Sequence, residues 1–306
     1  MLFRSRYVLG VDGGGTKTDA VIADEHGKII SSASNGGANW ERMGIDKALI
    51  SLEEVICKAA EIAGIKTSQI ESASFAIAGI DWPDDVALYL PLTERLGISN
   101  FEITNDSFAA LFAGAGKLEG IVSIAGTGGK TAGIYAGKEA QTMGMELGEG
   151  GGAGQLVGLA LEYIAMQHHQ SAEPSALYQL IPTLMNMEPG TPFFQAVARS
   201  GLRLNESLAP EIFKLTATSD PGAMYAVTRT AAQHANDVIG IAKQLGISNE
   251  SITIVRAGGL HTADNEAFDA EFENIVLGSL TNASLKVLAE APVIGAVQSA
   301  IGGLND

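Results

Sequence analysis

Cysteine is nearly absent from this chain of 306 residues, which contains Cys57 alone. A single thiol cannot form an internal disulfide or a cysteine-based zinc site, and it cannot hold an iron–sulfur cluster without cysteines from another chain. Long hydrophobic runs are also missing, because glycine or a charged residue interrupts each apolar segment before the roughly 18 residues that a bilayer span needs. We therefore expect a soluble, globular protein without a membrane segment.

Basic residues are few as well. Lys and Arg number 19 against 35 Asp and Glu, which gives a formal net charge of −16 at pH 7. A surface this acidic repels nucleic-acid backbones and anionic membranes, so we expect neither as a partner. Near the start, Val8–Asp12 brings in a charge before an apolar stretch of signal-peptide length can form. The expected location is the cytoplasm, and a polyanionic ligand would need backbone groups or a metal ion to hold it.

Glycine, in contrast, is abundant. Its 37 residues cluster at 13–15, 126–129, 148–154 and 258–259, and such clusters are typical of places where the backbone approaches a ligand or adopts positive φ. The first cluster lies inside a predicted three-stranded meander. The expected strands are 7–11, 18–24, 28–33, 72–78 and 101–104, and the expected helices are 45–63, 83–96 and 106–115.

The second half begins with the same pattern. A second meander is predicted at 121–125, 131–136 and 140–145, followed by a mostly helical region at 155–245, a strand at 252–255 and a last helix at 292–301. An offset of 113 residues pairs Gly13 with Gly126, Gly15 with Gly128, Lys17 with Lys130, Thr18 with Thr131 and Ala23 with Ala136. We therefore predict two copies of one α/β unit, 1–117 and 118–306, with a helical insertion in the second and a last helix that can pack back on the first.

The first glycine cluster has the chemistry of a phosphate-binding turn. The glycines at 13–15 let backbone N–H groups face a phosphate, Thr16 and Thr18 add hydroxyl donors, and Asp12 can hold Mg²⁺ through water. The alternative is an ordinary glycine-rich hairpin. A dinucleotide fingerprint would need glycine at position 18, and a Walker A loop would need lysine at position 16.

Gly129-Lys130-Thr131 imitates the end of a Walker A loop. Ile124 stands where that loop needs glycine, and 131–136 reads as a strand rather than the helix that a P-loop opens. We interpret 126–128 as a second phosphate-binding hairpin.

Together these motifs resemble the sugar kinase, Hsp70 and actin superfamily, and within it the N-acetylglucosamine kinase and BadF/BadG/BcrA/BcrD-type ATPase family. The resemblance covers nearly the whole chain and rests on Val11–Thr18, Asn105–Asp106, Ala125–Gly128, Gly148–Gly152 and Ala257–Gly259. It implies an α/β fold of duplicated ribonuclease-H-like (actin-like ATPase) domains with an interdomain cleft. ATP and Mg²⁺ would lie in that cleft, with a sugar beside the γ-phosphate.

The resemblance also assigns roles to residues. Nucleotide contacts would come from Gly13, Gly14, Gly15, Thr16, Lys17, Thr18, Gly126, Thr127, Gly128, Gly258 and Gly259. Sugar contacts would come from Asn39, Trp40, Gly79, Asp106, Thr127, Lys130 and Glu149, although Asn39 and Trp40 are also compatible with a turn and a core position. Asp106 would be the catalytic base that accepts the proton of the attacking sugar hydroxyl, and helix capping is its alternative role.

Two segments depart from the family's usual pattern. Glu149 lies in Gly148–Gly152, where Gly-Asp-Glu-Gly-Ser is usual, and Lys130 ends a segment that is usually Gly-Thr-Gly-Ser-Asn. An acid at position 149 could favour a free amine, whereas a Lys130–Glu149 pair would cancel that preference. N-acetylglucosamine, glucosamine, N-acetylmuramate and other sugars therefore all remain candidates.

The expected function is that of an ATP-dependent sugar kinase, with a non-catalytic nucleotide- or sugar-binding sensor as the alternative. Activator ATPases of the family hold an iron–sulfur cluster between subunits, and the position of Cys57 inside the predicted helix 45–63 argues against that role. His168 and His169 point to different faces of a helix, so we interpret them and His234 as solvated or core side chains. The oligomeric state stays open, with a homodimer as one option.

Overall fold

The computed structural model describes residues 6–144, 148–199 and 206–304, which form two compact units. Unit 1 comprises Met1–Val122, Gly133–Lys138 and Leu288–Asp306, and unit 2 comprises Ser123–Ala132 and Glu139–Val287. This division differs from the single boundary predicted after residue 117. The chain returns to unit 1 twice, and its last helix packs there against β1, β4 and α4.

Unit 1 contains a five-stranded sheet in the order β3-β2-β1-β4-β5. Its strands are β1 (Tyr7–Gly13), β2 (Lys17–Asp24), β3 (Ile29–Gly36), β4 (Ile70–Ile77) and β5 (Phe101–Thr104). The first three strands are antiparallel neighbours, and β4 and β5 join in parallel beside β1. The parallel strands β1, β4 and β5 end at the same edge of the sheet, and this edge carries the candidate site residues of unit 1.

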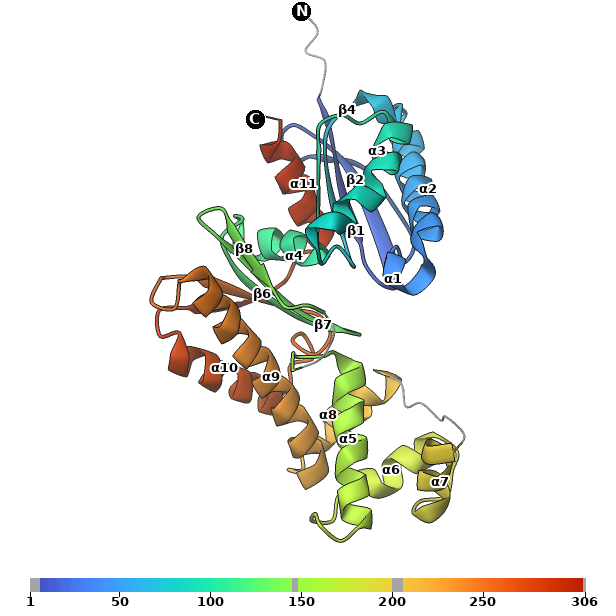
Figure 1. The fold of residues 1–306 in the computed structure, drawn as a ribbon, viewed down its shortest axis with the longest axis vertical. Coiled ribbons are helices and arrows are strands. Elements are labelled where there is room, and N and C mark those ends of the chain that lie inside the picture. Colours follow the sequence, from blue (N-terminus) through green and yellow to red (C-terminus); the bar gives the residue numbers. More distant parts are fainter. Residues whose placement is uncertain (1–5, 145–147, 200–205, 305–306) are drawn as a thin grey trace, which may run out of the picture. The chain divides into compact units, whose positions relative to one another are not determined.

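Helices cover both faces of this sheet (Figure 1). They are α1 (Trp40–Met43), α2 (Ile45–Ala63), α3 (Leu90–Leu96), α4 (Asp106–Ala115) and α11 (Pro292–Gly302), with short 3₁₀ turns η1 (Thr67–Gln69) and η2 (Pro83–Tyr89). Alternate residues of β1 face opposite sides, because successive side chains of a strand do. Leu9 packs in the cluster that includes α2, whereas Val8 packs against Val293 and Val297 of α11.

The second sheet has the order β10-β9-β6-β7-β8. Its strands are β6 (Gly120–Ala125), β7 (Gly129–Tyr135), β8 (Lys138–Gln141), β9 (Thr253–Ala257) and β10 (Ser284–Val287). β6 to β10 are the first to fifth strands of this sheet along the chain. Across the sheet from β8, they follow the order third, second, first, fourth and fifth, and the strands of the first sheet follow the same order from β3. The topology therefore repeats, as the sequence offset predicted.

The other helices belong to unit 2. They are α5 (Ala153–His168), α6 (Leu177–Leu184), α7 (Thr191–Arg199), α8 (Ala209–Thr216), α9 (Pro221–Leu245) and α10 (Glu266–Ser279), with the 3₁₀ turn η3 (Glu206–Leu208). The long helix α9 packs against α5, α8 and α10 (Figure 1). In the portion of the chain that the structure covers, no helix combines the length and the apolar character needed to cross a bilayer.

Two predicted elements need correction. The helix expected at 83–96 is the 3₁₀ turn η2 followed by α3, because Pro91 has no N–H to continue a helix from the residues before it and instead lies in the first turn of α3. The strand expected at 140–145 is shorter, since β8 ends at Gln141. Residue 145, the end of that prediction, lies outside the described residues.

Candidate active site

In unit 1, Asp106 is the first residue of α4, and one residue, Asn105, separates it from the end of β5. The capping role that competes with catalysis is taken by its neighbour. Asn105 accepts hydrogen bonds from the N–H of Ser107 at 3.0 Å and from the Ser107 hydroxyl at 2.6 Å, and its amide donates to Asp81 at 3.1 Å. The helix start is therefore capped without the Asp106 carboxylate.

Asp12, the second proposed acidic residue, lies near the end of β1 and interacts electrostatically with Asp106. Burial is the main reason that the pKa of Asp12 rises from 3.8 to about 7, followed by repulsion from Asp106 and Asp19. Lys17 opposes the rise. Burial and the neighbouring carboxylates thus both disfavour the ionised form of Asp12.

The glycine turn between β1 and β2 is a tight hairpin. Gly14 donates its N–H to the carbonyl of Lys17 at 2.9 Å, and the exposed tip is formed by Gly15, Thr16 and Lys17. Thr18, which we expected to donate its hydroxyl to a phosphate, is completely buried in β2. Its side chain therefore does not reach the hairpin surface, and its contact with a phosphate stays a prediction.

Three of the residues expected at a sugar come together in unit 1. The indole N–H of Trp40 donates to the carbonyl of Gly79 at 2.7 Å. A β-carbon at Gly79, where φ is +88°, would lie 3.2 Å from the Trp40 ring and 3.4 Å from the Asn39 side-chain oxygen. That oxygen caps α1 through the N–H of Arg42 at 3.2 Å. The turn interpretation of Asn39 is thus realised, and it leaves the side chain beside the indole.

In unit 2, three glycine segments pack backbone against backbone. A β-carbon at Gly129 would lie 1.8 Å from the carbonyl oxygen of Gly150. A β-carbon at Gly152 would lie 2.4 Å from the carbonyl oxygen of Thr127, and a β-carbon at Gly258 would lie 2.5 Å from the carbonyl oxygen of Ala125. Backbone hydrogen bonds connect the same segments. The N–H of Ala153 donates to the carbonyl of Gly126, and the N–H of Leu260 donates to the carbonyl of Ala125, both at 2.8 Å. The hairpin 126–128 is therefore held from two sides.

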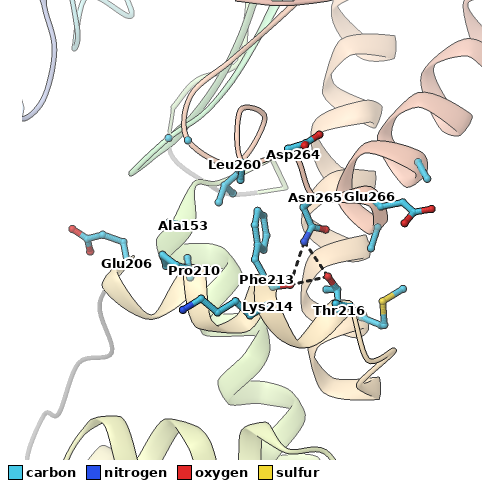
Figure 2. A pocket seen from close by; sticks show the side chains of 18 of the residues that line it. Ala153, Glu206, Pro210, Phe213, Lys214, Thr216, Leu260, Asp264, Asn265 and Glu266 are labelled. Atoms are coloured by element: carbon cyan, nitrogen blue, oxygen red, sulfur yellow. Dashed lines mark hydrogen bonds between the residues drawn. The ribbon is translucent and has the colours of Figure 1, made fainter.

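Beside this hairpin lies a cavity of about 1130 Å³. It brings together Gly126 and Thr127 of the second phosphate motif, Gly259 of the adenosine motif and Ala153 at the start of α5. Phe213, Leu260 and Asn265 form part of the wall (Figure 2), and the Asn265 amide donates to the Phe213 carbonyl at 3.3 Å and the Thr216 hydroxyl at 2.9 Å. The cavity suits a nucleotide in size, and its glycines leave backbone groups accessible.

Lys130 and Glu149, the two departures from the family pattern, are both buried, with 9% and 7% of their surface exposed. The Lys130 ammonium donates to the carbonyl of Thr142, and Glu149 accepts from the N–H of Met143 at 2.7 Å. Both side chains thus hold the same two-residue stretch after β8. This arrangement favours a role in positioning that stretch over direct contact with a substrate.

One acidic residue of this region was not singled out in the sequence. Asp237 of α9 accepts from the N–H of Gly150 at 2.6 Å, and burial raises its pKa from 3.8 to about 6. His234, one α-helical turn earlier, is completely buried, which agrees with its interpretation as a core histidine. The spacing of residues 234 and 237 predicts that they share one face of a helix. The sequence does not predict that this face contacts residues 150–151.

A magnesium ion is implied by the resemblance, and the acidic edge of unit 1 fits one. The carboxyl groups of Asp12 and Asp106 lie close enough to interact at this edge, and Mg²⁺ commonly uses one or two carboxylates and takes its other ligands from water and phosphate. Among the described residues, no group of three or more His, Cys, Asp or Glu side chains could hold a metal ion. The protein alone therefore offers a partial ligand set.

Two sheets of one topology, with a glycine hairpin in each unit and a nucleotide-sized cavity beside one of them, define an ATPase of the actin-like fold. The chain belongs to the BadF/BadG/BcrA/BcrD ATPase family, which matches residues 9–303. This confirms the family resemblance seen in the sequence.

Individual relatives agree with the assignment. An N-acetyl-D-glucosamine kinase from Dictyostelium discoideum is 36% identical over 39% of this chain and 41% of its own length. The chain thus spans less than half of that relative. A glucosamine kinase from Vibrio cholerae is 27% identical over 74% of this chain and 77% of its own. A solved structure from Chromobacterium violaceum, assigned as an N-acetylglucosamine kinase, has a TM-score of 0.71 at 20% identity, covering 98% of this chain and 99% of that chain. It confirms the predicted fold class.

Proposed function

We propose that the protein is an ATP-dependent kinase for an amino sugar of the N-acetylglucosamine or glucosamine type. One observation carries the assignment of the base: Asn105 caps α4, so Asp106 at the first helical position is not the cap. The names of the relatives support a sugar as the acceptor. The cavity lined by Thr127 and Gly259 supports a nucleotide as the donor.

In the reaction, Asp106 accepts the proton of a sugar hydroxyl while that oxygen attacks the γ-phosphorus of ATP. The bond between the phosphorus and the β,γ-bridging oxygen breaks, and ADP leaves. Asp106 lies next to the sheet edge where β1, β4 and β5 end. The sheet holds this residue in place, because α4 begins just after β5 ends. A rigid base at a strand end keeps the hydroxyl aligned, which is the main contribution that a protein makes to phosphoryl transfer.

Backbone groups carry the phosphates in this proposal. The hairpin residues 14–17 contact phosphate oxygens in unit 1, and 126–128 does so in unit 2, where α5 begins directly beside the hairpin. Gly258 and Gly259 border the nucleoside. Asp12 would hold Mg²⁺ through water, and the ion would neutralise part of the phosphate charge.

The sugar contacts are assigned to Asn39, Trp40 and Gly79. The Trp40 indole lies against Gly79 and offers an apolar ring that can cover a sugar face, and the Asn39 amide beside it can bond to hydroxyl or acetamido groups. Lys130 and Glu149 act more remotely by holding 142–143. We place the reaction in the cytoplasm, where ATP is available.

The test is an ADP-release assay with N-acetylglucosamine, glucosamine, N-acetylmuramate and glucose, each with and without Mg²⁺. The expected result is turnover of at least one amino sugar well above glucose, with the sugar phosphate identified by mass spectrometry. ADP release that is equal with and without every sugar contradicts the kinase assignment. Nucleotide binding without any turnover would point to the non-catalytic sensor.

A further inference from the structure

Two buried histidines of unit 2 have no role in the mechanism above. His234 of α9 is 0% exposed and His261, in the turn after β9, is 2% exposed. The hydroxyl of Ser123 in β6 lies between them, 3.2 Å from His234 Nδ1 and 3.1 Å from His261 Nε2. At the outer ends, His234 Nε2 lies 2.8 Å from the Gly151 carbonyl oxygen, and Arg256 Nε lies 3.3 Å from His261 Nδ1.

The two ends fix the direction of every hydrogen bond in this chain. A guanidinium has donors only, so Arg256 donates to His261 Nδ1, and His261 then carries its proton on Nε2. A carbonyl oxygen accepts only, so His234 donates from Nε2 to Gly151, and the neutral ring that its complete burial favours then accepts at Nδ1. Ser123 satisfies both neighbours, because its oxygen accepts from His261 while its hydrogen goes to His234.

The chain therefore runs one way, from Arg256 through His261, Ser123 and His234 to Gly151. Each histidine is a neutral Nε2–H tautomer. A second proton on His261 would face the Arg256 donor, and one on His234 would occupy the acceptor to which Ser123 donates. Arg256 is itself anchored by Glu273 at 2.7 Å and by Asp269. The His261 ring is fixed by edge contacts with Phe268 and Phe272, whose ring centroids lie 5.2 and 4.8 Å away.

Members of the hydrogen-bond chain lie next in sequence to residues that line the nucleotide-sized cavity. His261 follows Gly259 and Leu260, and Gly151 precedes Ala153 by two residues. Ser123 lies in β6, three residues before the hairpin that starts at Gly126. The hydrogen-bond chain thus connects the two glycine segments that hold the hairpin 126–128.

We propose that Arg256, His261, Ser123 and His234 form a directional hydrogen-bond chain that positions the Gly150–Gly152 loop and the 258–260 turn relative to the phosphate hairpin. This role rests on the proposed kinase function, in which that hairpin holds the transferred phosphate. None of the four side chains is assigned a ligand contact. They are positioning residues, and their effect reaches the reaction through the backbone of Gly151 and Leu260.

The first test replaces Ser123 by alanine, which removes the shared hydroxyl and leaves both histidines in place. Misalignment of reacting groups by about 1 Å costs on the order of 100-fold in rate, so S123A should lower kcat by roughly 10- to 100-fold. KM for ATP and for the sugar should stay within about threefold, because Ser123 is assigned no contact with either. A folded S123A protein that keeps kcat within about threefold overturns the proposal.

Ser175→Ala is the matched control. Ser175 is also a buried serine of unit 2, and it donates to Asp220 at 2.6 Å at the start of α9. It does not line the cavity. S175A should lose stability as S123A does while kcat stays within about twofold. An equal loss of kcat in both variants would mean that only general stability matters, and it would also overturn the proposal.

A second pair of variants covers the case in which S123A does not fold. Glutamine at position 234 can still accept from Ser123 and donate to Gly151, whereas leucine has a similar length but neither group. H234Q should recover most of the rate that H234L loses, and the two should differ by at least about fivefold in kcat. Equal rates for the two contradict a hydrogen-bond chain.

The tautomers can be read without any enzyme assay. Long-range ¹H–¹⁵N spectra of the histidine-labelled wild-type protein should show His234 and His261 as neutral Nε2–H forms at pH 7, with assignments from the H234Q variant and from H261Q. A Nδ1–H tautomer or a charged ring at either position overturns the proposal. Because this measurement needs no sugar, failure of the chain and failure of the kinase assignment are distinguishable.

Discussion

A β-carbon at Gly152 would lie 2.4 Å from the carbonyl oxygen of Thr127. Gly152 has φ −88° and ψ −151°, a backbone conformation that other residues adopt without strain. Glycine is needed here only for the close approach of two backbones. The glycine loop before α5 therefore acts as a support for the phosphate hairpin.

Gly152→Ala should accordingly damage both stability and nucleotide binding. The methyl group has to displace backbone, and overpacking of this kind costs typically about 1–3 kcal/mol. We expect a lower free energy of unfolding and at least about tenfold weaker ATP binding, measured by denaturant titration and calorimetry.

Gly154→Ala, two residues later, is the control. A β-carbon at that position meets no atom within 4 Å, and Gly154 is in α5, where alanine stabilises a helix by roughly 0.5–1 kcal/mol relative to glycine. G154A should be as stable as the wild type or more so. If G152A also binds ATP normally, the support role of this loop is wrong.

The positions of the glycine clusters are evident from the sequence, but the reasons why glycine is needed there could be predicted only in part. The sequence predicted approach to a ligand, and Gly126 and Gly259 do line the cavity. Gly129, Gly152 and Gly258 instead face other backbone segments. The backbone segment that each of these glycines contacts is distant in the sequence, so local sequence patterns cannot predict the contact.

Helices that end at glycine were predicted to the residue. The helices 45–63 and 106–115 stop before Gly64 and Gly116, both at positive φ, which is the usual signal for a C-terminus. Helix α10 was not predicted, although Phe268, Phe272 and Val276 recur every four residues and are buried. Its many polar residues made the apolar stripe narrow, and that repeat was the signal that could have found it.

The residues of the candidate site could likewise be predicted only in part. The sequence motifs located Asp12 and Asp106 at strand ends, but the choice between base and helix cap for Asp106 depended on Asn105, since either residue is a good cap. The chain from Arg256 to Gly151 could not be predicted, because its members lie on separate elements and only the tertiary fold brings them together.

Acid should weaken the protein through His234. Burial lowers its pKa from 6.5 to about 4, so the folded state binds the proton less readily than the unfolded state. The stabilising contribution is present above pH 6.5 and is lost as pH falls to about 4, with a slope near 1.4 kcal/mol per pH unit. Burial also holds the pKa of His261 well below its usual range, with the same sign.

The measurement compares unfolding free energies of the wild type and H234Q between pH 4 and 7. Their difference should shrink by about 3 kcal/mol as pH falls across this window. Asp237, whose raised pKa of about 6 acts with the opposite sign, is present in both proteins and cancels to first order. A difference that is independent of pH would show that His234 does not titrate as its burial requires.

Asp106→Asn should abolish sugar phosphorylation while ATP binding survives. Asparagine fits the same space but cannot accept a proton, and general-base assistance is worth roughly 10²- to 10⁴-fold in rate. We expect kcat to fall by that factor and the Kd for ATP to stay within about threefold. Asp46→Asn, in the first turn of α2 and exposed, makes the same chemical change away from the site and should leave kcat unchanged. Turnover of D106N within a few-fold of the wild type would reject Asp106 as the base.

Glu149→Gln tests whether the buried acid selects an amine. A charge contact with a substrate ammonium would make the loss in kcat/KM about tenfold larger for glucosamine than for N-acetylglucosamine, a difference of about 1.4 kcal/mol. The structure favours a different result, because the carboxylate is buried and accepts from the N–H of Met143, beside the carbonyl that Lys130 holds. We therefore expect E149Q to lower kcat/KM for both sugars by a similar factor.

The similarity of the two losses follows from what glutamine changes. Its side-chain oxygen can still accept from Met143, but the negative charge that strengthens this bond is gone, so 142–143 is held less firmly whichever sugar is present. Glu250→Gln, on an exposed turn of the same unit, controls for the loss of one negative charge and should change neither value. A loss confined to glucosamine would instead place Glu149 in direct contact with the amine, and the specificity for a free amino sugar would then depend on this residue.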